Sequence, residues 1–201
     1  QMKYKPVPYV ERQINIINNT TPYNGRVNIE EPENPDARFQ MFEKIADANE
    51  RVSESNNLLY ENICVLFYRG NDKNRETKKC SYDEYLIYVN QLLQKNQKLA
   101  FLVQSDETEF IEFITNKFPN NSFYFNDEIR HMKKCNDTVD IKMKSQNYEF
   151  SKKYLAITII MSRCQYIICG TGNCDIWIML YRANNKNVIQ NNNGTWYNSA
   201  F

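Results

Sequence analysis

Ile63-Cys-Val-Leu-Phe-Tyr-Arg-Gly-Asn-Asp-Lys73 is the stretch of sequence that decides the fold. Its first six residues are apolar with no polar alternation, which is typical of a strand covered on both faces of a parallel sheet. Polar residues begin where this strand is expected to end, at the sheet edge where open α/β folds bind ligands. Arginine offers a planar fork of donors suited to phosphate, and glycine lets the backbone approach a ligand closely. The stretch therefore predicts a phosphate site, with an ordinary polar turn as the alternative. The candidate residues are Arg69, Gly70, Asp72 and Lys73.

Composition narrows the range of partners. The chain has 201 residues, 25 of them basic and 24 acidic, for a net charge of +1. Such a balance gives no large field to attract nucleic acid or an anionic membrane, so any anion site must be local. No apolar run approaches the roughly 18 residues that a membrane span needs. We therefore expect neither a nucleic-acid partner nor a membrane segment.

The six cysteines include no CxxC pair, and no histidine lies near them at zinc-binding spacing. No metal site is predicted from this pattern. Cys64, Cys164 and Cys169 lie in apolar stretches, where a free cysteine behaves as a small hydrophobic residue. This favours a reducing, cytoplasmic setting. The secretory lumen stays open as an alternative, because the cysteine count is even and Asn-x-Ser/Thr triplets occur.

The first 37 residues contain every proline except Pro119, together with an acidic cluster from Glu30 to Asp36. With little apolar periodicity, residues 1–37 are predicted to form an extended arm or linker. Residues 38–53 repeat apolar side chains at helical spacing, which indicates an amphipathic helix before the first strand. We expect the arm to lead out of a preceding domain in a longer parent protein.

After Lys73, strand and helix patterns alternate. A capping box at Ser81-Tyr-Asp-Glu84 predicts the start of one helix, and Asp106 is expected to cap the next, which Pro119 prevents from continuing. The remaining segments are predicted as strands at 98–103, 122–125, 165–169 and 187–189, a long loop at 126–147, and helices at 148–163 and 173–182. This alternation predicts an α/β fold, a Rossmann-like doubly wound parallel sheet of about five strands. The domain is expected to span 38–190, followed by a frayed, Asn-rich tail at 191–201 in which Trp196 and Tyr197 could dock.

Two further strand ends carry candidate chemistry. Gln104-Ser-Asp-Glu107 follows the second strand, with helix capping as its alternative role. Cys169-Gly-Thr-Gly-Asn173 is a strand-to-helix turn whose backbone N–H groups and helix dipole would favour a pyrophosphate. A diphosphate held between Arg69 and this turn is the resulting hypothesis. It requires that the two elements converge, and that the arginine is not committed to an internal ion pair. The additional candidate binding residues are Asp106, Gly170, Thr171, Gly172 and Asn173.

Other catalytic classes find less support in the sequence. His131 is the only histidine and lies in the charged loop, and there is neither a Walker lysine motif nor a dinucleotide GxGxxG.

Three motifs, in order and spacing, resemble those of fucosyltransferases of the α-1,6, α-1,2 and protein O-fucosyl group. They are Leu66-Phe-Tyr-Arg-Gly-Asn-Asp-Lys73, then Ser105-Asp-Glu107 before a helix ending at Phe118-Pro119, then Met161-Ser-Arg-Cys-Gln-Tyr-Ile-Ile-Cys-Gly-Thr-Gly-Asn173. The resemblance covers about residues 61 to 190. It implies the carboxyl-terminal, nucleotide-sugar-binding half of a GT-B glycosyltransferase that inverts configuration, uses GDP-fucose and needs no metal or other cofactor.

Within this resemblance, Arg69 falls on the essential arginine that contacts the β-phosphate and stabilises the leaving GDP. Thr171 and Asn173 fall in the turn that meets the diphosphate, and Asp106 falls on the acidic position of the second motif. The implied partners are a nucleotide sugar, a glycan or protein acceptor, and a preceding acceptor-binding domain, which about 60 residues before the first strand are too few to form.

The chain departs from the family pattern at three positions. Phe67 replaces the family's histidine, Gly70 replaces its second arginine, and Ile157 aligns with the acid that recognises guanine. Either Glu149 or another residue contacts the base, or the base is not guanine, or the domain no longer transfers sugar. The alternative function is therefore a noncatalytic Rossmann-like module for binding or assembly.

Overall fold

The computed structural model describes residues 60–71, 73, 77–125, 131–135, 137, 141 and 147–201, without the side chains of 147–150 and 152. The predicted arm at 1–37, the predicted helix at 38–53 and much of the predicted loop at 126–147 lie outside these residues.

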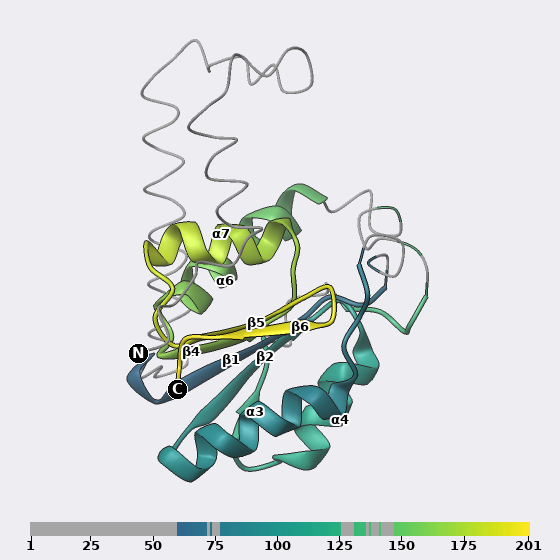
Figure 1. Cartoon of the computed structure of the whole chain (residues 1–201). Helices are drawn as coiled ribbons and strands as arrows, with labels where there is room; N and C mark the ends of the chain where they lie inside the picture. The colour runs from purple at the N-terminus through teal and green to yellow at the C-terminus, as the bar shows by residue number, and fades with distance from the viewer. Residues whose placement is uncertain are drawn as a thin grey trace.

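A sheet of six strands in the order β3-β2-β1-β4-β5-β6 forms the centre of the fold (Figure 1). The strands are β1 (Ile63–Tyr68), β2 (Ala100–Ser105), β3 (Ser122–Phe123), β4 (Tyr166–Cys169), β5 (Val188–Asn192) and β6 (Thr195–Asn198). All neighbours pair in parallel except β5 and β6, which are antiparallel. The prediction of a Rossmann-like, doubly wound α/β sheet is confirmed, with one antiparallel strand beyond the expected number.

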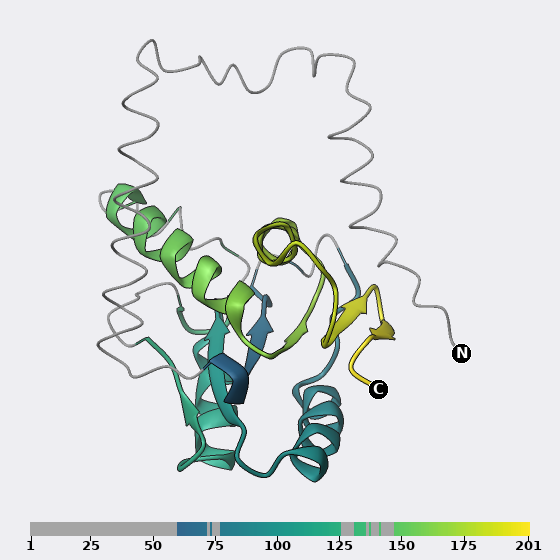
Figure 2. The same ribbon diagram turned by 90° about the vertical axis from the view of Figure 1, so that its left-hand side faces the viewer.

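Helices cover both faces of this sheet. The helices α3 (Tyr82–Lys95) and α4 (Thr108–Lys117) lie on one face, and α6 (Asn147–Arg163) and α7 (Asn173–Arg182) on the other (Figure 2). A short 3-10 turn, η1 (Tyr60–Asn62), precedes β1. The predicted capping box begins α3, with Ser81 and Glu84 each accepting from the other's backbone N–H. No helix among the described residues is long and apolar enough to cross a membrane.

Strand β1 contributes side chains to both hydrophobic cores, one on each face of the sheet. All six of its residues are buried, as the apolar run predicts. Alternate side chains, such as Leu66 and Phe67, point to opposite faces, so that Leu66 packs with α3 and α4 and Phe67 with α6 and α7. Because both faces of β1 are covered, its residues are apolar on both sides, and polar residues begin only where the strand ends.

The direction of chain winding reverses beside β1. From β1 the chain proceeds outward through β2 to β3, and it then returns to place β4 on the opposite side of β1. In open α/β sheets, ligands bind in the crevice outside the carboxyl ends of the two strands that flank such a reversal. The topology therefore singles out the ends of β1 and β4.

The Asn-rich segment at the C-terminus is ordered as a hairpin, so the prediction of a frayed tail after residue 190 is wrong. Asn193 and Gly194 have φ angles of 52° and 89°. These are values that a tight two-residue hairpin turn requires and that Asn-Gly adopts readily. The predicted docking of Trp196 is confirmed, because its ring packs on Tyr88 at a centroid distance of 4.6 Å and its Nε1 donates to Glu84 at 3.0 Å. The domain consequently continues through β6.

Candidate functional site

The ends of β1 and β4 bring two of the predicted elements together. Phe67 of β1 pairs in register with Cys169 of β4, and Arg69 and Gly170 follow these strands at the same edge of the sheet. The convergence that the diphosphate hypothesis requires is therefore present in the fold.

A small pocket lies at this edge, and we call it the carboxyl-edge pocket. It has a cavity volume of about 20 Å³, on the scale of one ordered water or a single small group. Four of its residues are basic and none is acidic, and two of the four, Arg69 and Lys79, are paired with Asp106 and Glu107, which do not line the pocket. The lining residues are Tyr68, Arg69, Lys73, Thr77, Lys78, Lys79, Cys80, Tyr85, Gly170, Thr171, Asn191 and Asn193.

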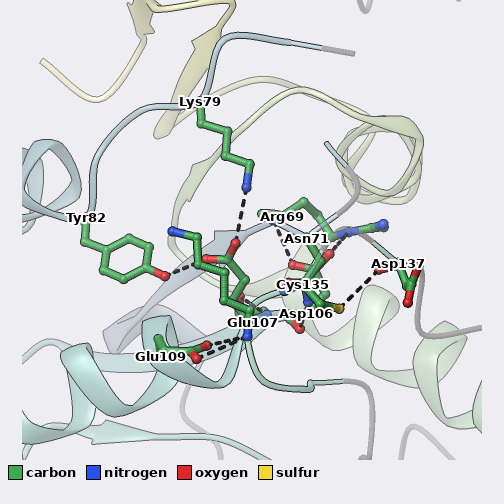
Figure 3. Close-up of polar contacts among 12 residues, drawn as sticks. Arg69, Asn71, Lys79, Tyr82, Asp106, Glu107, Glu109, Cys135 and Asp137 are labelled. Carbon is green, nitrogen blue, oxygen red and sulfur yellow. Dashed lines mark hydrogen bonds and ion pairs between the residues drawn. The ribbon is translucent and has the colours of Figure 1, made fainter. Parts of the chain in front are cut away.

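Arg69 is held by an internal ion pair. Its Nε donates to Asp106 Oδ2 at 2.9 Å (Figure 3). Its Nη1 donates to Cys174 Sγ at 3.4 Å. The side chain of Arg69 is 25% exposed and that of Asp106 only 7%, so the pair is partly shielded from water. The expectation of an arginine uncommitted to an internal ion pair is therefore wrong, although Arg69 still borders the pocket.

Asp106 joins the second motif to the first. Besides its bond to Arg69, its Oδ1 accepts from the backbone N–H of Gly70 at 2.7 Å, and its carbonyl accepts from Asn71 Nδ2 at 2.6 Å. The expected capping role of Asp106 is wrong, because α4 begins at Thr108 with Glu107 as its N-cap residue and without a side-chain cap. The carboxylate instead fixes the turn after β1, and with it the direction of Arg69.

Gly70 is required by a buried carboxylate next to it. A Cβ atom at this position would lie 2.0 Å from Glu107 Oε1. Glu107 is fully buried, and its carboxylate accepts from Tyr82 Oη and from Lys79 Nζ, the latter at 3.2 Å (Figure 3). Any side chain in place of Gly70 would therefore displace a paired, buried acid. An arginine at position 70 could not be accommodated without this displacement.

The turn after β4 is tied to the neighbouring strand. Thr171 Oγ1 donates to the carbonyl of Asn191 at 2.6 Å, so this hydroxyl braces the turn. Gly172 is the N-cap residue of α7, and a Cβ there would lie 3.5 Å from Lys73 Cε, which places the buried Lys73 side chain against the turn. A Cβ atom at Gly170 would contact nothing within 4 Å, so the space beside this residue is open. The fourth candidate, Asn173, is exposed at the first position of α7.

Asp175 is a buried acid that the sequence analysis missed. It lies in the first turn of α7 and is 1% exposed, and its Oδ1 has no hydrogen-bond partner among the described residues. Burial raises the pKa of Asp175 to about 7, against the opposing influence of Arg69 and Lys73. The sequence offered only a weak signal for Asp175, an acidic residue just after a glycine turn. Acids are common in the first turns of helices and are rarely buried there, so the pattern did not single this one out.

The raised pKa of Asp175 predicts a pH-dependent stability. Below about pH 7 the folded protein keeps a proton on Asp175, whereas the unfolded carboxyl releases it near pH 3.8. The contribution of Asp175 to the free energy of unfolding is therefore lost as the pH rises through 7. The free energy of unfolding falls by about 2 kcal/mol between pH 5.5 and 7.5. We expect Asp175→Asn to remove this part of the pH dependence in urea unfolding at the two pH values. Comparison with the unsubstituted protein cancels other titrations, including that of His131, whose pKa is lowered by burial. Parallel stability curves for the two proteins would contradict the prediction.

The remaining sequence candidates occupy different positions. Phe67 is buried in the core under α6 and α7. Ile157 of α6 packs in the same core and is 4% exposed. Asp72 lies outside the described residues, as does the side chain of Glu149. His131 contacts Thr108 Oγ1 at 3.0 Å, at the start of α4.

The six cysteines are free thiols, and four of them are buried. These include Cys64, Cys164 and Cys169, as their apolar surroundings in the sequence predict. Among the described residues, no group of three or more His, Cys, Asp or Glu side chains could hold a metal ion.

No protein-family model matches the chain, and no curated protein matches it.

Proposed function

We propose that this domain binds the phosphate groups of a nucleotide sugar at the carboxyl edge of its sheet, as the donor-binding domain of a glycosyltransferase. The observation that carries the proposal is the cationic pocket at the end of β1 and β4, the two strands where the winding reverses. This is the place where folds of this class bind ligands, and an excess of positive charge selects anions among them.

The proposed chemistry follows from the charges around the pocket. Departure of a nucleoside diphosphate from a sugar places negative charge on the leaving phosphate, and preorganised cations lower the energy of that state. Arg69 and Lys73 both lie at the N-terminus of α7. Arg69, held in place by Asp106, donates to Cys174 in the first turn of this helix, and Lys73 lies against Gly172, its N-cap residue. We assign the catalytic role to Arg69, which departs from the sequence-based hypothesis because the guanidinium would contact the leaving phosphate while it is paired with Asp106. Lys73 and the turn at 170–173 are the binding elements.

The donor sugar rests on the ordered motifs alone. Their resemblance to fucosyltransferases favours GDP-fucose, with inversion and without metal, and a glycan or protein as acceptor. The burial of Ile157 leaves the guanine contact to another residue.

Calorimetric titration with GDP, UDP and GDP-fucose tests the proposal. We expect saturable binding of at least one of them with a Kd below about 1 mM. Arg69→Ala should abolish the signal, because it removes a charge and a fork of donors from the pocket. Absence of any heat at millimolar nucleotide would reject the proposal.

A pair of lysine variants separates a local site from general attraction. Lys78 is exposed and lines the pocket, so Lys78→Ala is expected to weaken binding about fivefold, which corresponds to roughly 1 kcal/mol. Lys98 is also exposed, but it precedes β2 at the opposite edge of the sheet. Lys98→Ala should leave the affinity unchanged, and equal effects of the two substitutions would argue against a site at the carboxyl edge.

The alternative function is a noncatalytic binding or assembly module. The observation that favours it is the Arg69–Asp106 ion pair beside a pocket of only about 20 Å³. A module of this kind would keep the ion pair as a structural brace and bind no nucleotide. The same titration separates the two functions.

A further inference from the structure

The buried side chain of Asn191 has an unsatisfied hydrogen-bond donor. It lies in β5, is 3% exposed, and lines the carboxyl-edge pocket. Its Nδ2 has no hydrogen-bond partner among the described residues. Because leaving a buried donor unpaired is costly, a group that accepts from it is expected in the bound state.

The rest of the Asn191 side chain is already fixed in place. Its Oδ1 accepts from the backbone N–H of Gly194 at 3.0 Å across the hairpin turn. The same turn is joined to the loop after β1, because Asn193 Oδ1 accepts from the backbone N–H of Lys78 at 2.9 Å. The hairpin therefore holds the Asn191 amide in a single orientation beside the basic residues of the pocket.

The neighbouring residue, Gln190, provides an internal comparison. It is 1% exposed, and both atoms of its amide also lack a partner among the described residues. Successive residues of a strand point to opposite faces. Ile189 packs with α3 and α4, and Val188 with α6 and α7, so Asn191 shares the face of the former and Gln190 that of the latter. Gln190 accordingly does not line the pocket.

We infer that the β5–β6 hairpin completes a subsite for one phosphoryl group, in which Asn191 Nδ2 donates a hydrogen bond to a phosphate oxygen. The basic side chains supply charge, and the volume of about 20 Å³ limits what enters the cavity to a single small group. This inference deepens the proposed function and rests on it, since it names a residue that would contact one phosphate of the nucleotide sugar. It adds the end of β5 and the hairpin turn after it to a site that the family resemblance places only on the ends of β1, β2 and β4.

The direct test is a titration of the ¹⁵N-labelled protein with inorganic pyrophosphate, followed by the side-chain amide resonances. We expect the Asn191 resonances to shift in a saturable manner while those of Gln190 stay in place. No shift at Asn191, or equal shifts at both amides, would overturn the inference. This readout needs no substitution, so an unfolded variant cannot obscure it.

Comparison with nucleotide binding separates this inference from the proposed function. Saturable shifts at Asn191 with pyrophosphate, without calorimetric binding of any nucleotide, would support the subsite and reject the proposed function. Nucleotide binding that leaves the Asn191 amide unmoved would reject the subsite and leave the proposed function in place.

A matched pair of substitutions provides a second test. Asn191→Asp keeps the oxygen that accepts from Gly194 and replaces the donor by a negatively charged acceptor. We expect it to weaken pyrophosphate binding at least about tenfold. Gln190→Glu makes the same chemical change one residue away, on the opposite face, and should change the affinity less than about threefold. Equal losses in the two variants would contradict a contact by Asn191.

Discussion

Asp106→Ala is expected to lower the free energy of unfolding by about 2 to 4 kcal/mol, a large part of the stability of a typical domain. The substitution removes the carboxylate that pairs with Arg69 Nε and accepts from the N–H of Gly70. Since Arg69 is 25% exposed, water compensates part of this loss, and the cost stays below that of a fully buried pair. Urea unfolding followed by circular dichroism measures the change.

Two comparisons identify the cause. Asp106→Asn keeps an oxygen for the Gly70 N–H and loses only the charge, so it should cost less than the alanine variant. Glu112→Ala removes an exposed acid from α4 and should change stability by less than about 0.5 kcal/mol. If all three substitutions had similar effects, Asp106 would not be the link between the two strand ends.

Gly70→Ala is expected to cost about 3 kcal/mol, because the new methyl group would overlap the Glu107 carboxylate. The built Cβ lies 2.0 Å from Glu107 Oε1 and 2.1 Å from its Cδ. To make room, the carboxylate would have to leave Lys79 and Tyr82, which both bind it. Thermal and urea unfolding of the variant measure the loss.

Gly170→Ala is the matched control for this prediction. It lies after the neighbouring strand at the same edge, and a Cβ there meets nothing within 4 Å. We expect its stability to change by less than about 1 kcal/mol, in either direction. In a Glu107→Ala background, the cost of Gly70→Ala should largely disappear, because the group it overlaps is gone. An unchanged cost in that background would contradict a clash with Glu107.

Apolar periodicity was sufficient to predict most of the fold. The unbroken apolar run of β1 indicated a strand buried on both faces, and the capping box at Ser81 marked the start of α3. The hairpin was missed because β5 and β6 are built largely of Asn and other polar residues, whose composition is typical of a loop. Their order comes from tertiary contacts, such as that of Trp196 with α3, and from the Asn193-Gly194 turn.

The sequence predicted where the candidate residues lie, but it did not predict most of the hydrogen bonds that they make. Polar residues after buried strands must lie at the sheet edge, which is why Arg69 and Gly170 were placed together correctly. Hydrogen-bond partners distant in sequence have no local pattern, so the bonds from Arg69 to Asp106 and from Thr171 to β5 could not be inferred. Asp175 and Asn191 were missed for the same reason, since their burial depends on elements that pack around them.

A crystal structure of the domain with GDP tests the central claim most directly. We predict that the diphosphate lies outside the ends of β1 and β4, within hydrogen-bonding distance of Arg69 or Lys73 and of backbone N–H groups at the start of α7. A nucleotide bound at another face of the sheet, or a carboxyl-edge pocket without ligand at saturating GDP, would contradict the account.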